Sequence, residues 1–167
     1  MVSLKITHKS TELQKALKQH KELVSNPAAI LKNVGEALHN ATIDRMRRER
    51  APDGSPWAPL NPLYASSKRG SKILQEAGMR NGLMGSLNYQ VMLDRLEYGT
   101  NKVYAHIHQE GGTIKPTSAD RLSFRMGGKF FQAKSVTIPA RPYLGIGINE
   151  ERAIDNAVHD YIKSVFR

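Results

Sequence analysis

Cysteine is absent from this chain of 167 residues, which excludes disulfides, thiolate nucleophiles and cysteine-ligated zinc together. Long apolar runs are absent as well. None approaches the roughly 18 residues that span a bilayer, and the chain does not begin with an apolar segment behind a basic leader. We therefore expect a soluble protein without a membrane partner, and its lack of cysteine agrees with assembly in a reducing cytoplasm.

The length predicts one ordinary domain, because a chain of about 150 residues can bury roughly two-thirds of its unfolded surface without disulfides or metals. We therefore expect residues 1–167 to form a single domain. Lys and Arg outnumber Asp and Glu by 25 to 15, and this excess favours contact with a polyanion or an acidic protein surface. About half of it lies in 115–141, where Asp120 faces the bases Lys115, Arg121, Arg125, Lys129, Lys134 and Arg141.

Periodicity predicts the elements of the first fifty residues. Apolar and polar residues alternate over 2–7, which is typical of a short strand with one buried face. Helical spacing follows over 11–26, and a wider apolar stripe from Pro27 to Arg48 predicts the longest helix. Arg45 and its basic neighbours then lie near the negative end of the helix dipole.

The segment 51–62 contains four prolines and an Asp-Gly turn signal, so we expect an ordered loop. Trp57 is the only tryptophan of the chain, and a large ring of this kind usually anchors its loop on the core. A helical turn at 63–69 and a brief helix around 83–87 are expected to follow.

Two hairpins are predicted further along the chain. The first spans 89–98 with a turn near Asp94-Arg95 of unfavourable turn chemistry, and a short helix at 102–110 then ends at Gly111-Gly112. The second hairpin is basic and joins two strands between Leu122 and Ile138 through a glycine turn at Gly127-Gly128.

The C-terminal part predicts an edge or closing strand over 139–148, followed by a helix that Asn149 caps. Glu150 and Glu151 occupy the first turn, and the apolar residues up to Val165 recur in steps of three and four. No alternation of helix and parallel strand is present. The sequence therefore predicts an α+β fold, in which an antiparallel sheet or small sandwich with two hairpins packs against two or three helices. A basic hairpin projects from it at about 114–138.

Candidate catalytic residues are few. His106 and His108, with Glu110 nearby, are metal-ligand types, but residues two apart on a helix point in nearly opposite directions and cannot share one ion. We expect one histidine to pack in a partly buried position and the other to face solvent. The carboxylates Asp44, Glu49 and Asp53 are explained by capping and turn formation.

Phosphate-binding and nucleophile motifs are not matched either. The paired glycines fit neither a Walker loop nor a dinucleotide fingerprint, and Ser66-Ser67-Lys68 lacks the context of a nucleophile elbow. We expect no catalysis, no cofactor and no metal. The basic hairpin is left with three interpretations: contact with acidic protein neighbours, binding of nucleic acid through its bases and Phe124, Phe130 and Phe131, or a solvated edge.

An ordered set of short segments resembles the phage virion-morphogenesis family, which includes tail-completion proteins, over about residues 30–165. The segments are rich in proline, glycine and aromatic residues. They are 52–60, Ile73-Leu74-Gln75 with Gly78, Leu83-Met84-Gly85-Ser86-Leu87, Gly99-Thr100, Tyr104-Ala105, His108-Gln109, Gly111-Gly112 and 138–145.

This resemblance implies a virion component that completes tails or joins head to tail at the neck, forms a homo-oligomeric ring, and contacts other tail or neck proteins and passing DNA. It brings no catalytic residues. The candidate contacts are the exposed-looking bases and two rigid turns: Arg121, Arg125, Lys129, Lys134, Trp57, Arg141 and Tyr143. A DNA-binding accessory protein and a small hydrolase or nuclease are the alternatives, in that order.

Overall fold

The computed structural model describes residues 18, 21, 27–75 and 82–165. The strand predicted at 2–7 lies outside the described residues. Most of the helix predicted at 11–26 does too, although Lys18 and Lys21 are described and helical.

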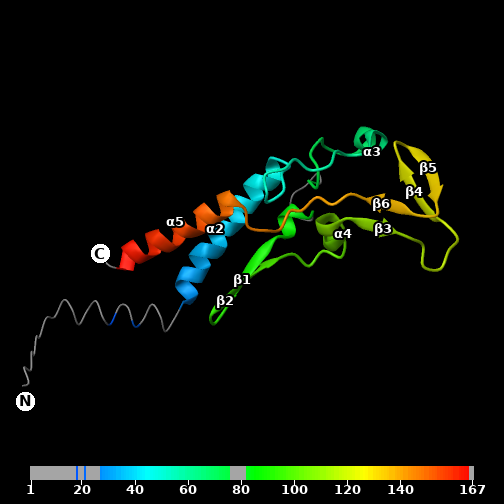
Figure 1. The fold of residues 1–167 in the computed structure, drawn as a ribbon. Helices are drawn as coiled ribbons and strands as arrows, with labels where there is room; N and C mark the ends of the chain where they lie inside the picture. Colours follow the sequence, from blue (N-terminus) through cyan, green and yellow to red (C-terminus); the bar gives the residue numbers. More distant parts are fainter. Residues whose placement is uncertain (1–17, 19–20, 22–26, 76–81, 166–167) are drawn as a thin grey trace, which may run out of the picture.

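Two long helices form one end of the described chain. Helix α2 spans Ala28–Arg47 and α5 spans Ile148–Val165, which confirms the predicted long and C-terminal helices. They lie side by side (Figure 1) and pack through half-buried residues such as Ile154 and Val158 on α5. The cap prediction was wrong, because Asn149 is already helical; instead Glu150 accepts a hydrogen bond from the Gly147 N–H at 3.0 Å. No helix in the described part is long and apolar enough to cross a membrane.

The first predicted hairpin is confirmed and packs against α2. Strand β1 (Asn88–Met92) pairs antiparallel with β2 (Arg95–Gly99), so that Tyr89 lies opposite Tyr98. The turn consists of Leu93 and Asp94, one residue earlier than predicted. Before this hairpin the chain follows the expected proline-rich loop, the short helix α3 (Pro62–Ser67) and a turn of 3₁₀ helix, η1 (Met84–Ser86).

The segment after the hairpin differs from its prediction. Helix α4 spans Ala105–Glu110 and ends at Gly111, whose φ of 71° suits glycine. The basic segment then forms β3 (Gly112–Ile114), β4 (Leu122–Met126), β5 (Lys129–Ala133) and β6 (Val136–Ile138). The predicted second strand is divided at Lys134-Ser135: β5 pairs with β4, whereas β6 turns back and pairs with β3.

The closing strand predicted over 139–148 is wrong. The described residues 139–147 contain no strand, because their backbone groups bond elsewhere. The Arg141 N–H donates to the His108 carbonyl at 2.8 Å, and the Gln109 side chain bonds the next residues. A side chain on α4 therefore takes the place of a neighbouring strand.

The buried residues divide the chain into two regions. Met46, Trp57, Leu83 and Tyr143 are among the core residues, which all lie within 38–105 and 141–150. None of residues 111–140 is buried. We call 111–140 the arm, and the rest of the described chain, apart from 58–75, the body. Figure 1 shows the arm extending away from α2 and α5 toward α3. The α+β class is confirmed, and the described strands form separate antiparallel pairs.

Candidate assembly surface

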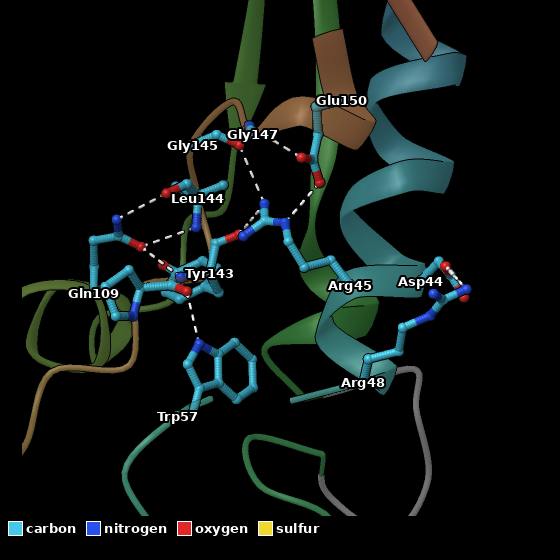
Figure 2. Close-up of polar contacts among 11 residues, drawn as sticks. Asp44, Arg45, Arg48, Trp57, Gln109, Tyr143, Leu144, Gly145, Gly147 and Glu150 are labelled. Atoms are coloured by element: carbon cyan, nitrogen blue, oxygen red, sulfur yellow. Dashed lines mark hydrogen bonds and ion pairs between the residues drawn. The ribbon is translucent and has the colours of Figure 1, made fainter. Parts of the chain in front are cut away.

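A buried ion pair ties the start of α5 to the end of α2 (Figure 2). Arg45 Nε donates to Glu150 Oε1 at 2.6 Å, and the two side chains are only 6% and 1% exposed. Arg45 Nη2 also donates to the carbonyl oxygens of Tyr143 and Gly145, both at 3.1 Å. A buried pair persists only where further hydrogen bonds compensate for lost hydration. The bonds of Arg45 Nη2 and of Glu150 provide this in part, whereas Arg45 Nη1 is buried without a hydrogen-bond partner among the described residues. The result is a fixed position for 143–147 on the helices.

Trp57 and Arg141 join the proline-rich loop to the segment that follows the arm. Trp57 Nε1–H donates to the Pro142 carbonyl at 2.8 Å, and Arg141 donates to the carbonyls of Ala58 and Pro59 at 2.7 and 2.9 Å. Burial lowers the pKa of Arg141 from its usual value. These bonds cross more than 80 residues of sequence and hold two otherwise irregular segments together.

Gln109 fixes the base of the arm from its other side (Figure 2). Its side-chain oxygen accepts hydrogen bonds from the backbone N–H groups of Tyr143 and Leu144, at 3.0 and 2.9 Å. Its Nε2 donates to the Leu144 carbonyl at 3.0 Å. Both ends of the arm are therefore attached to the body at the same place.

We call the region in which the proline-rich loop, α4 and residues 141–147 are hydrogen-bonded together the junction. Three predicted contact residues lie inside it. Trp57, Arg141 and Tyr143 are 6%, 6% and 1% exposed, and the Tyr143 hydroxyl donates to the Ala105 carbonyl at 3.3 Å. The expectation that Trp57 anchors its loop on the core is confirmed. Since these side chains are absent from the surface of the subunit, any contribution to assembly acts through the shape of the junction.

The four predicted basic contacts are all exposed on the arm. The ladder places Arg125 opposite Phe130 and Met126 opposite Lys129, near the glycine turn. Arg121 and Lys134 adjoin the last pair at the other end of the hairpin. None of these four bases forms an ion pair with another described residue. The structure thus separates them into two groups at opposite ends of one hairpin.

The face of the β4–β5 hairpin that carries Phe124 and Phe131 is mainly apolar, with Lys129 at its end beside the glycine turn. Phe124 and Phe131 stack with ring centroids 5.9 Å apart and planes 17° from parallel. This face borders a hollow of about 480 Å³, which we call the groove and which the sequence did not reveal. Its walls come from the loop before α3, from α3, from the segment after α3, from the chain around α4 and from β6: Leu60, Tyr64, Leu74, Tyr104, Val136 and Ile138. Lys68 and Arg125 add positive charge.

Helix α3 supports the far end of the hairpin. Asn61 caps α3 by accepting from the backbone N–H of Leu63 at 2.9 Å. Ser67 Oγ accepts from the Gly127 N–H at 3.0 Å, across 60 residues of sequence. A Cβ added to Gly127 would lie 2.7 Å from Leu63 Cγ, so the turn needs glycine to approach α3 this closely. The arm therefore has a second, smaller attachment at its tip.

The residues weighed as catalytic have structural contacts instead. Glu49 accepts from the Ile73 N–H at 2.7 Å, and Asp44 pairs with Arg48 at 2.7 Å. Asp53 accepts from the N–H and hydroxyl of Ser55, and these bonds lower the pKa of its carboxyl group. The turn predicted for Asp53 is confirmed, whereas Asp44 forms an ion pair along the end of α2 and Glu49 bonds a distant backbone N–H, so capping and turn formation do not account for those two acids.

The two histidines lie as the helical spacing predicted. His106 is exposed, whereas His108 is half-buried and meets Tyr104 edge to face at 5.9 Å between ring centroids. Over the described ranges, no group of three or more histidines and carboxylates is placed to hold a metal ion.

Comparison with known protein families gives a match. The model of the phage virion morphogenesis family matches residues 8–163, well over half of the chain and including the body and the arm. No curated protein and no solved structure matches. The resemblance read from the sequence segments is thereby confirmed, and the chain belongs to the phage virion morphogenesis family.

Proposed function

We propose that this protein completes the tail, or joins head to tail at the neck, of a phage virion, and that it does so as a homo-oligomeric ring without catalysis. Family membership supports the morphogenesis role itself. The observation that carries the finer proposal is the arm, since 111–140 extends from the body without a single buried residue. Surfaces of this kind are typical of subunits that bury them against neighbours.

The rigid junction fits the same role. A subunit of a neck or tail ring needs a projecting contact held at a constant angle. Arg45, Gln109 and Arg141 provide this by bonding the chain on both sides of the arm. We expect the partners to be other copies of this chain and other tail or neck proteins of the same phage.

Locating the protein in particles tests this proposal. Virions and tail intermediates of the encoding phage or prophage are purified and probed with a specific antibody, by immunoblot and by gold labelling in electron micrographs. We expect label at the head-proximal end of the tail, and unjoined heads and tails when the gene is disrupted. Absence from both virions and tail intermediates would overturn the proposal.

A DNA-binding accessory role is the second candidate, because the arm carries exposed bases that form no ion pair with another described residue, and two of them, Arg125 and Lys129, lie near Phe130, which is 62% exposed. Binding through phosphates weakens steeply as salt rises. A DNA affinity that persists in the monomer, falls steeply between 50 and 200 mM salt and is lost on neutralising Arg125 and Lys129 would favour this role. Salt-independent behaviour and no retention of DNA would exclude it.

A further inference from the structure

The turn of the β1–β2 hairpin violates two local preferences at one residue. Leu93 is 90% exposed although its side chain is apolar, and its φ is 38°, in the left-handed region that two-residue turns normally fill with Asn or Gly. Asn would relieve both problems. Residues that break local rules without a benefit to the isolated fold are typical of functional sites.

A negatively charged side chain lies next to the exposed Leu93. Asp94 follows it in the turn and is exposed, and it forms no ion pair with a described residue, since the neighbouring Arg95 pairs with Glu97 at 3.1 Å. We call Leu93 and Asp94 together the knob.

The groove has the complementary character. Its walls are mainly aliphatic and aromatic, which suits Leu93. Lys68 and Arg125 supply positive charge, which complements the negative charge of Asp94. Its volume of about 480 Å³ lies within the range of pockets that hold ligands, roughly 300–1,000 Å³.

The knob cannot enter the groove of its own chain. Figure 1 shows the β1–β2 turn pointing away from the arm, at the opposite end of the body from α3 and β4. A contact between two such unlike surfaces is head to tail, and repetition of one head-to-tail contact produces a closed ring when the rotation closes.

We propose that the knob of one subunit docks in the groove of a second copy of this chain, with Leu93 among the apolar walls and Asp94 beside Arg125. This inference deepens the proposed ring and rests on that function. The contact orders the arm, because the groove wall formed by Phe124 and Val136 becomes covered on docking. It is the centre of an interface rather than the whole of it.

The Leu93→Asn variant tests the apolar half of the contact. Asn suits the positive φ, so we expect unfolding by urea to be unchanged or shifted to higher concentration. Loss of one buried leucine should raise the dissociation constant of the oligomer by about ten- to a hundredfold per contact, measured by light scattering over a concentration series. Ile146→Asn, at a side chain 58% exposed and outside both surfaces, is the matched control and should assemble as the wild type does.

Reversal of charge tests the polar half. Asp94→Lys and Arg125→Glu should each weaken assembly, and a chain carrying both should recover a large part of it. Asp160→Lys, on the exposed side of α5, is the control and should have no effect. Assembly by the double variant weaker than by either single variant would overturn the proposed pairing.

Cross-linking tests the head-to-tail geometry, and the absence of native cysteine makes it specific. Met92→Cys places a thiol beside the knob, and Thr137→Cys places one in the groove. A short bis-maleimide should join the two variants when they are mixed, but should not join either variant to itself. Efficient self-cross-linking of one single-cysteine variant would show a symmetric contact and overturn the proposal.

The outcomes separate this inference from the proposed function. If the protein is found in tails and Leu93→Asn assembles as tightly as the wild type, the docking is wrong while the function stands. If it is absent from particles and Leu93→Asn still abolishes self-association, the function is wrong while the docking stands. A wild-type chain that stays monomeric at its highest soluble concentration would also overturn the docking.

Discussion

The body and the arm of this subunit are stabilised in different ways. The body buries Met46, Leu83 and Tyr143 almost completely, whereas the arm has no buried residue over 111–140. An isolated two-stranded ladder is marginally stable in water, so the arm depends on its attachments at the junction and at α3. The body is therefore stabilised by its own buried core, whereas the arm has none and is the region that the proposed function assigns to contact with other subunits.

The largest effect is expected in the body, from Glu150→Ala. It leaves the Arg45 charge buried without its partner, and loss of one member of such a pair costs about 3–5 kcal/mol of unfolding free energy. The measurement is urea denaturation followed by circular dichroism. Glu97→Ala is the matched variant, because Arg95 and Glu97 are 65% and 54% exposed, and it should cost below about 1 kcal/mol. Equal losses would contradict the contrast between buried and exposed pairs.

A second expectation compares an aromatic residue from each region. Trp57→Phe removes the bond to the Pro142 carbonyl and leaves that partly buried acceptor unpaired, at a cost of about 1–3 kcal/mol. Phe130→Leu on the arm should change unfolding free energy by less than about 0.5 kcal/mol, since that ring is 62% exposed. Thermal unfolding of the two variants measures the difference. If Phe130→Leu proved the more damaging, the arm would hold a core of its own.

The two glycines of the β4–β5 turn allow a test of how the arm is attached to α3. Gly127→Ala places a side chain on a left-handed backbone, which destabilises the turn by about 1–2 kcal/mol. The added Cβ also clashes with Leu63. We expect faster amide exchange over β4 and β5 and little change in the body. Gly128→Ala has the same backbone strain with open space around its Cβ, so the arm should stay attached to α3. Equal exchange in the two variants would mean that the approach to α3 does not hold the arm.

The smallest effect concerns alkaline pH and is confined to the body. Burial raises the pKa of Tyr98 and of Tyr143 above the usual value near 10. A raised folded-state pKa means that this stability is complete below pH 10 and is lost as pH rises through the folded value. The unfolding temperature should therefore fall above pH 10, and less steeply in Tyr143→Phe. An identical pH dependence in that variant would argue against a role for Tyr143.

Periodic elements could be predicted from the sequence because their signal is local. The apolar stripes of α2 and α5 and the alternation in β1 and β2 depend on neighbouring residues alone. Gly111 likewise marks the end of α4 because its backbone requires glycine.

Long-range pairing could not be predicted in the same way. Strand β3 is three residues long and pairs with β6 across more than 20 residues, a choice that no local pattern encodes. The predicted closing strand failed because the Gln109 side chain supplies the bonds that a strand would have supplied. The sequence placed Arg45 near the negative end of the helix dipole, and only the fold brings Glu150 to it from 105 residues away.

For the candidate site, the exposed bases and the unfavourable turn chemistry near Asp94 were visible in the sequence. The groove was not, because Tyr64, Tyr104 and Val136 come from three separate elements. The sequence indicated the burial of Trp57 but not that of Arg141 and Tyr143. A proline-rich segment can lie on the surface or in the core, so its composition alone does not decide which side chains are buried.

Gln109 and Arg141 attach both ends of the arm at nearly one point, with α3 as a lighter support at the tip. In mechanical terms the arm is a lever with one fulcrum. Because 111–140 has no buried residue, its orientation on the subunit depends on these few hydrogen bonds, and they involve the same segment that Arg45 fixes on α2 and α5.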